Sequence, residues 1–170
     1  MESDRVLFIV DAASLLYKAH DLYGMGSRID FLKLRERARA IMEEEPSVFI
    51  PVVQVFKRVA DESDKAPLVS YLTRRGFEVK LHPPTPSSFK GDHRAKETVK
   101  DITGRLATGA YNHLIVASAH GDLMKSCSNL SSNHLKVSFL LYGSPVEGVG
   151  VGSHFLTSDV IFTPKTGVTL

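Results

Sequence analysis

The sequence contains only one cysteine, Cys127, among 170 residues. A single thiol excludes an internal disulfide framework and a four-thiolate zinc site, and it fits a reducing compartment. No apolar run reaches the roughly 18 residues that a membrane span needs, and the first residues lack the basic start and apolar core of a signal peptide. We therefore expect a cytoplasmic protein with no membrane partner.

The sequence also lacks a large excess of charge of either sign, because 21 Lys and Arg residues nearly balance 19 Asp and Glu residues, for a formal net charge of +2. Overall charge therefore does not indicate nucleic-acid binding, which would have to come from local clusters of Lys and Arg. Internal repeats and low-complexity tracts are absent as well. The length, with 43% hydrophobic residues, predicts a single domain over residues 1–170 with a substantial core.

What the sequence does contain is an uninterrupted apolar segment, Val6 to Val10, that leads directly to Asp11. Such a run predicts a central parallel strand that is covered on both faces. In open α/β sheets, ligands bind in the crevice outside the carboxyl ends of the strands. Asp11 would stand at that end, where a carboxylate is placed for catalysis or for a metal ion.

Strand and helix patterns alternate along the rest of the chain. The expected strands cover residues 5–11, 47–56, 77–81, 113–118, 137–142 and 159–162. The expected helices cover residues 13–22, 31–42, 63–75, 94–106, 122–128 and 153–158, and the expected loops cover residues 83–92 and 143–152. This alternation predicts an α/β fold, with a doubly wound, mostly parallel sheet of about five or six strands flanked by helices.

Four residues are expected to fix the boundaries of these elements. Asp30 and Asp122 precede or begin helical segments and are predicted N-caps, and Gly76 follows a helix at the usual C′ position. Pro51 lies inside a predicted strand and cannot donate a ladder hydrogen bond. It therefore requires a sheet edge, a bulge or the start of a strand.

Three aspartates are expected to meet at the carboxyl edge of the sheet. Asp11 and Asp122 follow two of the predicted strands, and Asp101 lies on the helix between them. Like charges at short distance are costly unless a metal ion neutralises them, and Mg²⁺ and Mn²⁺ prefer oxygen ligands. These aspartates are therefore the predicted catalytic and metal-binding residues, with Glu97 or Asp92 as a supplementary acid.

Five parts of the sequence follow the motif order of a known family. Residues 11–15 (DAASL) are similar to D-G-x-N-L, and residues 26–34 contain a stretch similar to G…D-x-x-K-L. Asp101 matches a helix aspartate that precedes S-G-D-x-D-F, here residues 118–123 (SAHGDL), and residues 155–162 are similar to a helix followed by A-D-x-F-I. Over nearly the whole chain, the sequence resembles the NYN domains, PIN-like metal-dependent ribonucleases of the LabA and DUF88 type.

Three positions depart from the family pattern. Ser14 replaces an asparagine, and His120 replaces the first acid of S-G-D-x-D. Ala95 stands where the family has an acid after K-G, here in Lys90-Gly91-Asp92, and Asp92 or Glu97 could compensate. An imidazole could coordinate Mn²⁺ but suits Mg²⁺ poorly, because magnesium prefers oxygen ligands.

The resemblance implies hydrolysis of phosphodiester bonds in single-stranded RNA, with Mg²⁺ or Mn²⁺ as cofactor and a 5′-phosphate as product. A divalent ion offsets charge in the transition state and lowers the pKa of the attacking water. The residues expected to bind substrate or position water are Ser14, Ser118, His120, Lys90, Arg94 and Lys96. Tyr17 and Phe89 are candidates for stacking on bases, as aromatic residues do on single strands.

Simpler interpretations of the same residues remain open. Asp122 has the position of an ordinary N-cap, Asp159 that of a structural residue, and Asp101 could pair with Arg105 at helical spacing on the surface. A run of charged residues is usually a solvated helix face.

Two other functions also remain open. One is a catalytically inactive PIN-like domain that binds RNA or a protein partner, and a homodimer is left open too. The other is a binder of small ligands of the flavodoxin or nucleotide class, which uses the same crevice with backbone amides. Converging glycines would favour a nucleotide, but the glycine run at residues 148–152 does not follow the first strand.

Overall fold

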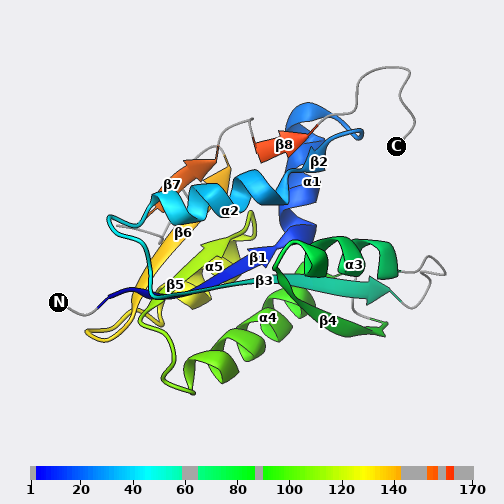
Figure 1. Ribbon diagram of the computed structural model, residues 1–170. Coiled ribbons are helices and arrows are strands. Elements are labelled where there is room, and N and C mark those ends of the chain that lie inside the picture. Colours follow the sequence, from blue (N-terminus) through cyan, green and yellow to red (C-terminus); the bar gives the residue numbers. More distant parts are fainter. Residues whose placement is uncertain (1–2, 59–64, 87–89, 143–152, 157–159, 163–170) are drawn as a thin grey trace.

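A six-stranded parallel sheet forms the centre of the structure, a computed structural model that describes residues 3–58, 65–86, 90–142, 153–156 and 160–162 (Figure 1). Its strand order is β4-β3-β1-β5-β6-β7, and all neighbouring strands are parallel. The strands are β1 (Arg5–Asp11), β3 (Val48–Arg58), β4 (Glu78–Thr85), β5 (His113–Ala117), β6 (Lys136–Tyr142) and β7 (Ser153–Leu156). The predicted doubly wound α/β fold is confirmed.

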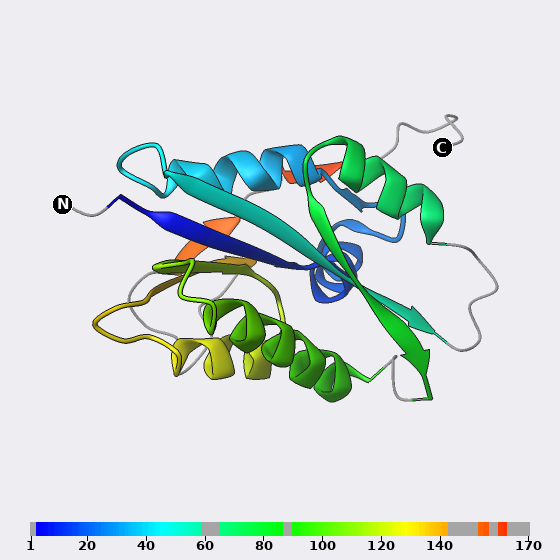
Figure 2. The same ribbon diagram turned by 60° about the horizontal axis from the view of Figure 1, so that its bottom comes forward.

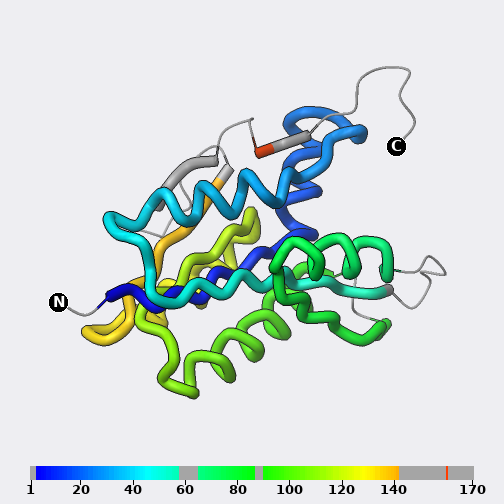
Figure 3. The backbone as a smooth tube through the Cα atoms, in the orientation of Figure 1, coloured from blue at the N-terminus to red at the C-terminus, as the bar shows by residue number. Residues whose placement is uncertain are grey.

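The path of the chain reverses its direction across the sheet between β1 and β5. Successive strands first extend from β1 through β3 to β4, and the chain then returns to β5 on the other side of β1. This is the 3-2-1-4-5-6 order of doubly wound folds, in which ligands bind outside the carboxyl ends of the strands where the order reverses. The dark blue β1 lies in the middle of the sheet (Figure 3). Asp11, the last residue of β1, therefore lies at the point where the strand order reverses.

Helices cover both faces of the sheet (Figure 2). One face packs against α1 (Ala12–Tyr23), α2 (Phe31–Ala40) and α3 (Ala66–Arg74). The other face packs against α4 (Gly91–Leu106) and α5 (Gly121–Ser128). Residues 6–10 of β1 are all fully buried and alternate between these two cores, which explains the uninterrupted apolar run in the sequence.

Several expected boundaries are confirmed. The Asp30 carboxylate accepts a hydrogen bond of 3.1 Å from the backbone N–H of Lys33 and caps α2. Gly76 has a φ of +85° just after α3, a conformation that favours glycine. Strand β4 pairs with β3 only from Val52 onward, so Pro51 lies where β3 has a neighbour on one side only.

Three expectations about local structure are wrong. Residues 153–156, expected to be helical, form β7, because the free edge of β6 offers parallel pairing. The segment 83–92 is not a continuous loop, since β4 extends to Thr85 and α4 begins at Gly91. Asp122 does not cap α5, because the side chain of His120 holds the N-cap position.

A small antiparallel ribbon stands apart from the main sheet. It pairs β2 (Arg28–Ile29) with β8 (Ile161–Phe162). The last expected strand is therefore present, but it belongs to this ribbon and not to the main sheet. Phe89, Asp159 and the glycine run at 148–152 lie outside the described residues. Within the described ranges, no helix is both long and apolar enough to cross a membrane.

Candidate functional site

Asp11 is held at the end of β1 by two serine hydroxyl groups. Ser14 Oγ and Ser118 Oγ donate to its Oδ2 at 2.7 and 2.8 Å. The same two oxygens accept hydrogen bonds from the backbone N–H groups of Ala119 (3.0 Å) and His120 (2.9 Å). Asp11 is only 5% exposed. Both serine hydroxyl groups bind Oδ2 of Asp11. Among the described residues, Oδ1 of Asp11 therefore keeps its capacity to accept hydrogen bonds, which suits a carboxylate that contacts water or a cation.

The register of the sheet places three polar side chains on one face. Asp11 pairs with Gln54 across β1 and β3, and it shares a face of β1 with Ile9, two residues earlier, which packs on the α4 and α5 side. Ser118, just after β5, lies on the same side through its hydrogen bond to Asp11. Asp11 at the end of β1, Ser118 just after β5 and Gln54 within β3, level with Asp11, therefore face α4 and α5.

Asp92, His120 and Asp122 form a second group, named here the open acidic group. Each offers one potential ligand atom, and these atoms all lie within 4.8 Å of one another. Asp92 lies in the first turn of α4 and Asp122 in the first turn of α5, and both are exposed. Among the described residues, no hydrogen bond or ion pair engages either carboxylate.

The close approach of two helix starts creates this group. A Cβ atom on residue 91 would lie 2.8 Å from Nε2 of His120, so only glycine permits the observed contact. His120 also caps α5, because its Nδ1 accepts the N–H of Leu123 at 3.2 Å. Gly91 and His120 together bring Asp92 and Asp122 to the same place.

The hydrogen bond at Nδ1 defines what His120 can do. A neutral imidazole that accepts at Nδ1 carries its proton on Nε2, so Nε2 is a donor in this arrangement and not a metal ligand. The carboxylate oxygens of Asp92 and Asp122 are the remaining potential ligands for a cation in this group. Mg²⁺ is commonly held by one or two carboxylates together with waters and substrate phosphates. These residues therefore fit a hard divalent ion.

Asp101 belongs to a different group. Its Oδ2 accepts hydrogen bonds from Gln54 Nε2 at 2.8 Å and from Arg105 Nε at 3.0 Å. The side chains of Asp101 and Arg105 are 11% and 19% exposed, and Arg105 also pairs with Glu78 at 2.9 Å. The interpretation of Asp101 as a partner of Arg105 is therefore confirmed, although the pair is more buried than a surface pair.

His82 completes this closed group, which consists of Gln54, His82, Asp101 and Arg105. Because the Gln54 amide nitrogen faces Asp101, its oxygen accepts from His82 Nε2 at 2.7 Å. His82 is buried and stacks on Phe56, with ring centroids 4.0 Å apart. Gln54 and His82 are not among the site residues predicted from the sequence. The available signal was a glutamine within an otherwise apolar strand segment, residues 52–55.

Burial and charge act on the closed group together. Burial lowers the pKa of His82, and the Lys80 charge lowers it further against the opposing effect of Asp101. Burial alone would also lower the pKa of Arg105, but its hydrogen bonds to Glu78 and Asp101 raise that pKa above its ordinary value. Arg105 is therefore a permanent cation that neutralises Asp101.

The three aspartates predicted as metal ligands thus lie in different groups of side chains. Among the described residues, the aspartates Asp11, Asp101 and Asp122 form no common cluster of the kind made by Asp92, His120 and Asp122. Asp101 does lie on the same face of the sheet as Asp11, through its bond to Gln54. Glu97 pairs with Lys100 at 3.3 Å.

The predicted substrate-binding residues of α4 lie at and near its first turn. Lys90 holds the N-cap position and is exposed, and Lys96 is exposed one and a half turns later. Arg94 is half-buried, and its guanidinium carbon lies 5.7 Å from the ring centroid of Tyr17 on α1. Positive charge therefore borders the open acidic group.

Cys127 of α5 lies beneath the Asp11 site. The thiol is buried, and burial together with the Asp11 charge raises its pKa to about 12. It is therefore neutral at physiological pH and has no nucleophilic character. Its side chain packs in the apolar core on the α4 and α5 side of the sheet.

The local sequence does not favour a nucleotide site of the doubly wound type. Such sites place a glycine-rich turn and the helix start against a phosphate. Here residues 11–15 contain no glycine, and the carboxylate of Asp11 stands at the start of α1. That negative charge would repel a phosphate at the same position.

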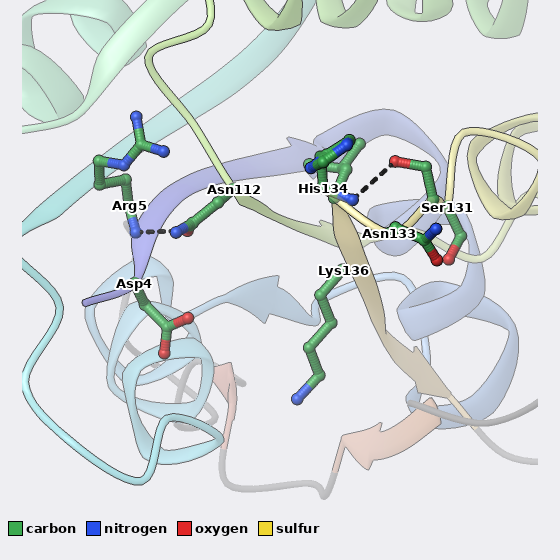
Figure 4. A pocket seen from close by; sticks show the side chains of 9 residues that line it. Asp4, Arg5, Asn112, Ser131, Asn133, His134 and Lys136 are labelled. Carbon is green, nitrogen blue, oxygen red and sulfur yellow. Dashed lines mark hydrogen bonds between the residues drawn. The ribbon is translucent and has the colours of Figure 1, made fainter. Parts of the chain in front are cut away.

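A polar hollow of about 520 Å³ lies at the opposite edge of the sheet (Figure 4). Asp4, Arg5, Asn112 and Lys136 line it, at or next to the amino ends of β1, β5 and β6. The backbone N–H of Arg5 donates to Asn112 Oδ1 at 2.7 Å. This hollow contains none of the predicted site residues.

Comparison with known proteins supports the fold. No protein-family model matches the sequence, and no curated protein matches it. A solved structure of a protein of unknown function from Vibrio parahaemolyticus RIMD 2210633 is similar, with a TM-score of 0.67 and 18% sequence identity. The match covers 95% of this chain and 100% of that chain. At this identity, the likeness establishes a shared fold alone.

Proposed function

We propose that this protein is a divalent-metal-dependent ribonuclease that hydrolyses phosphodiester bonds of single-stranded RNA with Mg²⁺ or Mn²⁺. The observation that carries the proposal is the open acidic group at the carboxyl edge of the sheet. Two hydrogen bonds at Ser118 connect it to Asp11, because Ser118 Oγ donates to Asp11 and accepts from the N–H of His120. The resemblance to the NYN domains points to the same chemistry.

Each residue of the site has a role in this proposal. Asp92 and Asp122 would hold the ion, which when bound offsets phosphate charge and lowers the pKa of the attacking water. Asp11 Oδ1 would accept a hydrogen bond from the attacking water, and Ser14 and Ser118 keep the carboxylate oriented. His120 Nε2 donates a hydrogen bond to a phosphate oxygen.

The basic residues support an anionic substrate. Lys90, Arg94 and Lys96 belong to the same helix start that supplies Asp92. Without a cation, Asp92 and Asp122 would repel a phosphate, and these basic residues oppose that repulsion only in part. A bound cation should therefore strengthen the binding of RNA at the cleavage point.

The test is cleavage of labelled single-stranded RNA in the presence of Mn²⁺. We expect the parent protein to cleave, and Asp122→Asn to lose about 100-fold or more in rate. Glu44→Gln is the matched control, because this exposed acid precedes β3 at the opposite edge of the sheet. Absence of cleavage by the folded parent with either ion, or full cleavage by Asp122→Asn, would refute the proposal.

Two observations favour the second candidate, an inactive PIN-like domain that binds RNA or a protein partner. Asp101, predicted as a ligand, is neutralised by Arg105, and His120 occupies the position of a family acid. This candidate predicts RNA binding without cleavage, and binding that does not change in Asp122→Asn. The assay above, combined with a binding measurement, separates the two candidates.

A further inference from the structure

Tyr17 is an exposed aromatic residue next to the candidate site. It lies on α1, the helix that begins directly after Asp11, and its side chain is 48% exposed. An exposed ring offers a flat apolar face on which another aromatic group can stack. The guanidinium carbon of Arg94 lies 5.7 Å from its ring centroid, within the range of a cation–π contact.

A series of short contacts connects this pair to the open acidic group. A Cβ atom on residue 91 would lie 3.9 Å from Arg94 Nη2 and 2.8 Å from His120 Nε2. Gly91 is therefore close to both Arg94 and His120, and the next residue along the chain is Asp92. Tyr17, Arg94 and the proposed metal ligands thus belong to one continuous surface that joins α1, α4 and the start of α5.

We propose that Tyr17 stacks on an unpaired nucleobase of the substrate while Arg94 binds the phosphate beside it. This inference rests on the proposed function, because it takes RNA as the substrate. A stacking ring recognises any base, but only a base that is not paired and stacked within a duplex. Arginine can bind phosphate through its fork of N–H donors and can also stack on a base. The pair therefore selects single-stranded RNA and sets where the strand lies relative to the acids.

A second tyrosine and arginine pair provides an internal control. Tyr71 on α3 is 38% exposed, and the guanidinium carbon of Arg75 lies 4.0 Å from its ring centroid. The chemistry matches that of Tyr17 and Arg94, but α3 covers the opposite face of the sheet from α4, the helix that carries Arg94 and Asp92. Loss of affinity through a general surface effect would therefore affect both tyrosines alike.

The experiment measures RNA binding by fluorescence anisotropy in EDTA, so that cleavage does not contribute. The probes are a labelled single-stranded RNA of mixed sequence, the same strand in a duplex, and the same strand with abasic positions. We expect Tyr17→Ala to weaken binding of the single strand about tenfold, while Tyr17→Phe and Tyr71→Ala stay within about twofold of the parent. Abasic positions should remove the difference between the parent and Tyr17→Ala.

Arg94→Ala gives a second, independent measurement. Loss of one phosphate contact should weaken binding of the single strand and reduce its dependence on salt concentration. Equal affinity of the parent and Tyr17→Ala, or an equal loss for Tyr17→Ala on duplex and single strand, would overturn the inference. Failure of cleavage alone would refute the proposed function and leave this result standing, because binding is measured without metal.

Discussion

Helix α4 carries two carboxylate groups with opposite surroundings. In the open acidic group, Asp92 is exposed and lies near a second acid, Asp122. In the closed group, Asp101 is mostly buried and bonded to Arg105 and Gln54. Asp101 lies nine positions after Asp92 along the helix, a rise of about 14 Å, so one ion cannot bind both.

The difference shows how a neighbouring cation decides the role of an acid. Arg105 lies one helical turn after Asp101 and supplies the positive charge that a metal ion would otherwise provide. Asp92 and Asp122 have no such partner among the described residues, so an added cation would relieve their mutual repulsion. The closed group is therefore structural, and the open group is the candidate for ion binding.

The largest expected effect concerns the stability of the closed group. Arg105→Leu leaves the mostly buried Asp101 carboxylate with Gln54 as its only hydrogen-bond partner among the described residues. We expect a loss of about 2–3 kcal/mol in the free energy of unfolding, less than for a fully buried pair. Urea denaturation followed by circular dichroism measures this loss.

Lys100→Leu is the matched control for that experiment. It removes a cation from an exposed pair with Glu97 on the same helix. Such exposed pairs contribute about 0.5 kcal/mol or less. If Arg105→Leu costs no more than Lys100→Leu, the closed group has no structural role of the kind inferred.

The next effect concerns the affinity of the open acidic group for a cation when a third carboxylate is added. His120→Asp keeps a good N-cap for α5 and adds a third carboxylate near Asp92 and Asp122. We expect Mg²⁺ to bind about tenfold more tightly, because affinity for hard cations rises with the number of charged oxygen ligands. Calorimetric titration measures the change. His120→Asn also caps the helix but adds no charge, and equal affinity of these two variants would contradict the expectation.

The smallest effect is the pH dependence of stability that His82 contributes. Its pKa is lowered in the folded state by burial and by Lys80, against Asp101 and Glu97, with a small lowering from His93. The unfolded chain therefore binds a proton more readily, and stability falls as the pH drops below the ordinary histidine value of about 6.5. His82→Gln keeps a donor for Gln54 but does not titrate.

Urea unfolding at pH 7.5 and pH 5.5 provides the measurement. The parent should lose more stability between these two conditions than His82→Gln does. An equal loss in both proteins would show that His82 is not a source of the acid sensitivity. It would also show that the closed group does not keep this imidazole neutral.

Much of the fold was predictable because its signals are local. The apolar run at residues 6–10, the cap at Asp30 and Gly76 after α3 each depend on neighbours in sequence. Residues 153–156 were predicted incorrectly, because the pairing with β6 that makes them a strand is a contact between distant segments. Short segments without strong periodicity are decided by such partners.

The candidate site was predictable only in part, for the same reason. The topology rule correctly brings Asp11 and Ser118 to one edge of the sheet. The sequence does not reveal that Gln54, from a different strand, is bonded to Asp101. Nor does it reveal that Gly91 allows His120 to join two helix starts. The role of Asp92 as a ligand therefore changes from supplementary to central in the proposal.

The most direct test of this account is Mn²⁺ binding, measured by electron paramagnetic resonance on three proteins. We expect the parent to bind Mn²⁺, Asp122→Asn to bind at least about tenfold more weakly, and Asp101→Asn to bind within about twofold of the parent. If Asp101→Asn abolished Mn²⁺ binding while Asp122→Asn kept it, the assignment of the ion to the open acidic group would be wrong.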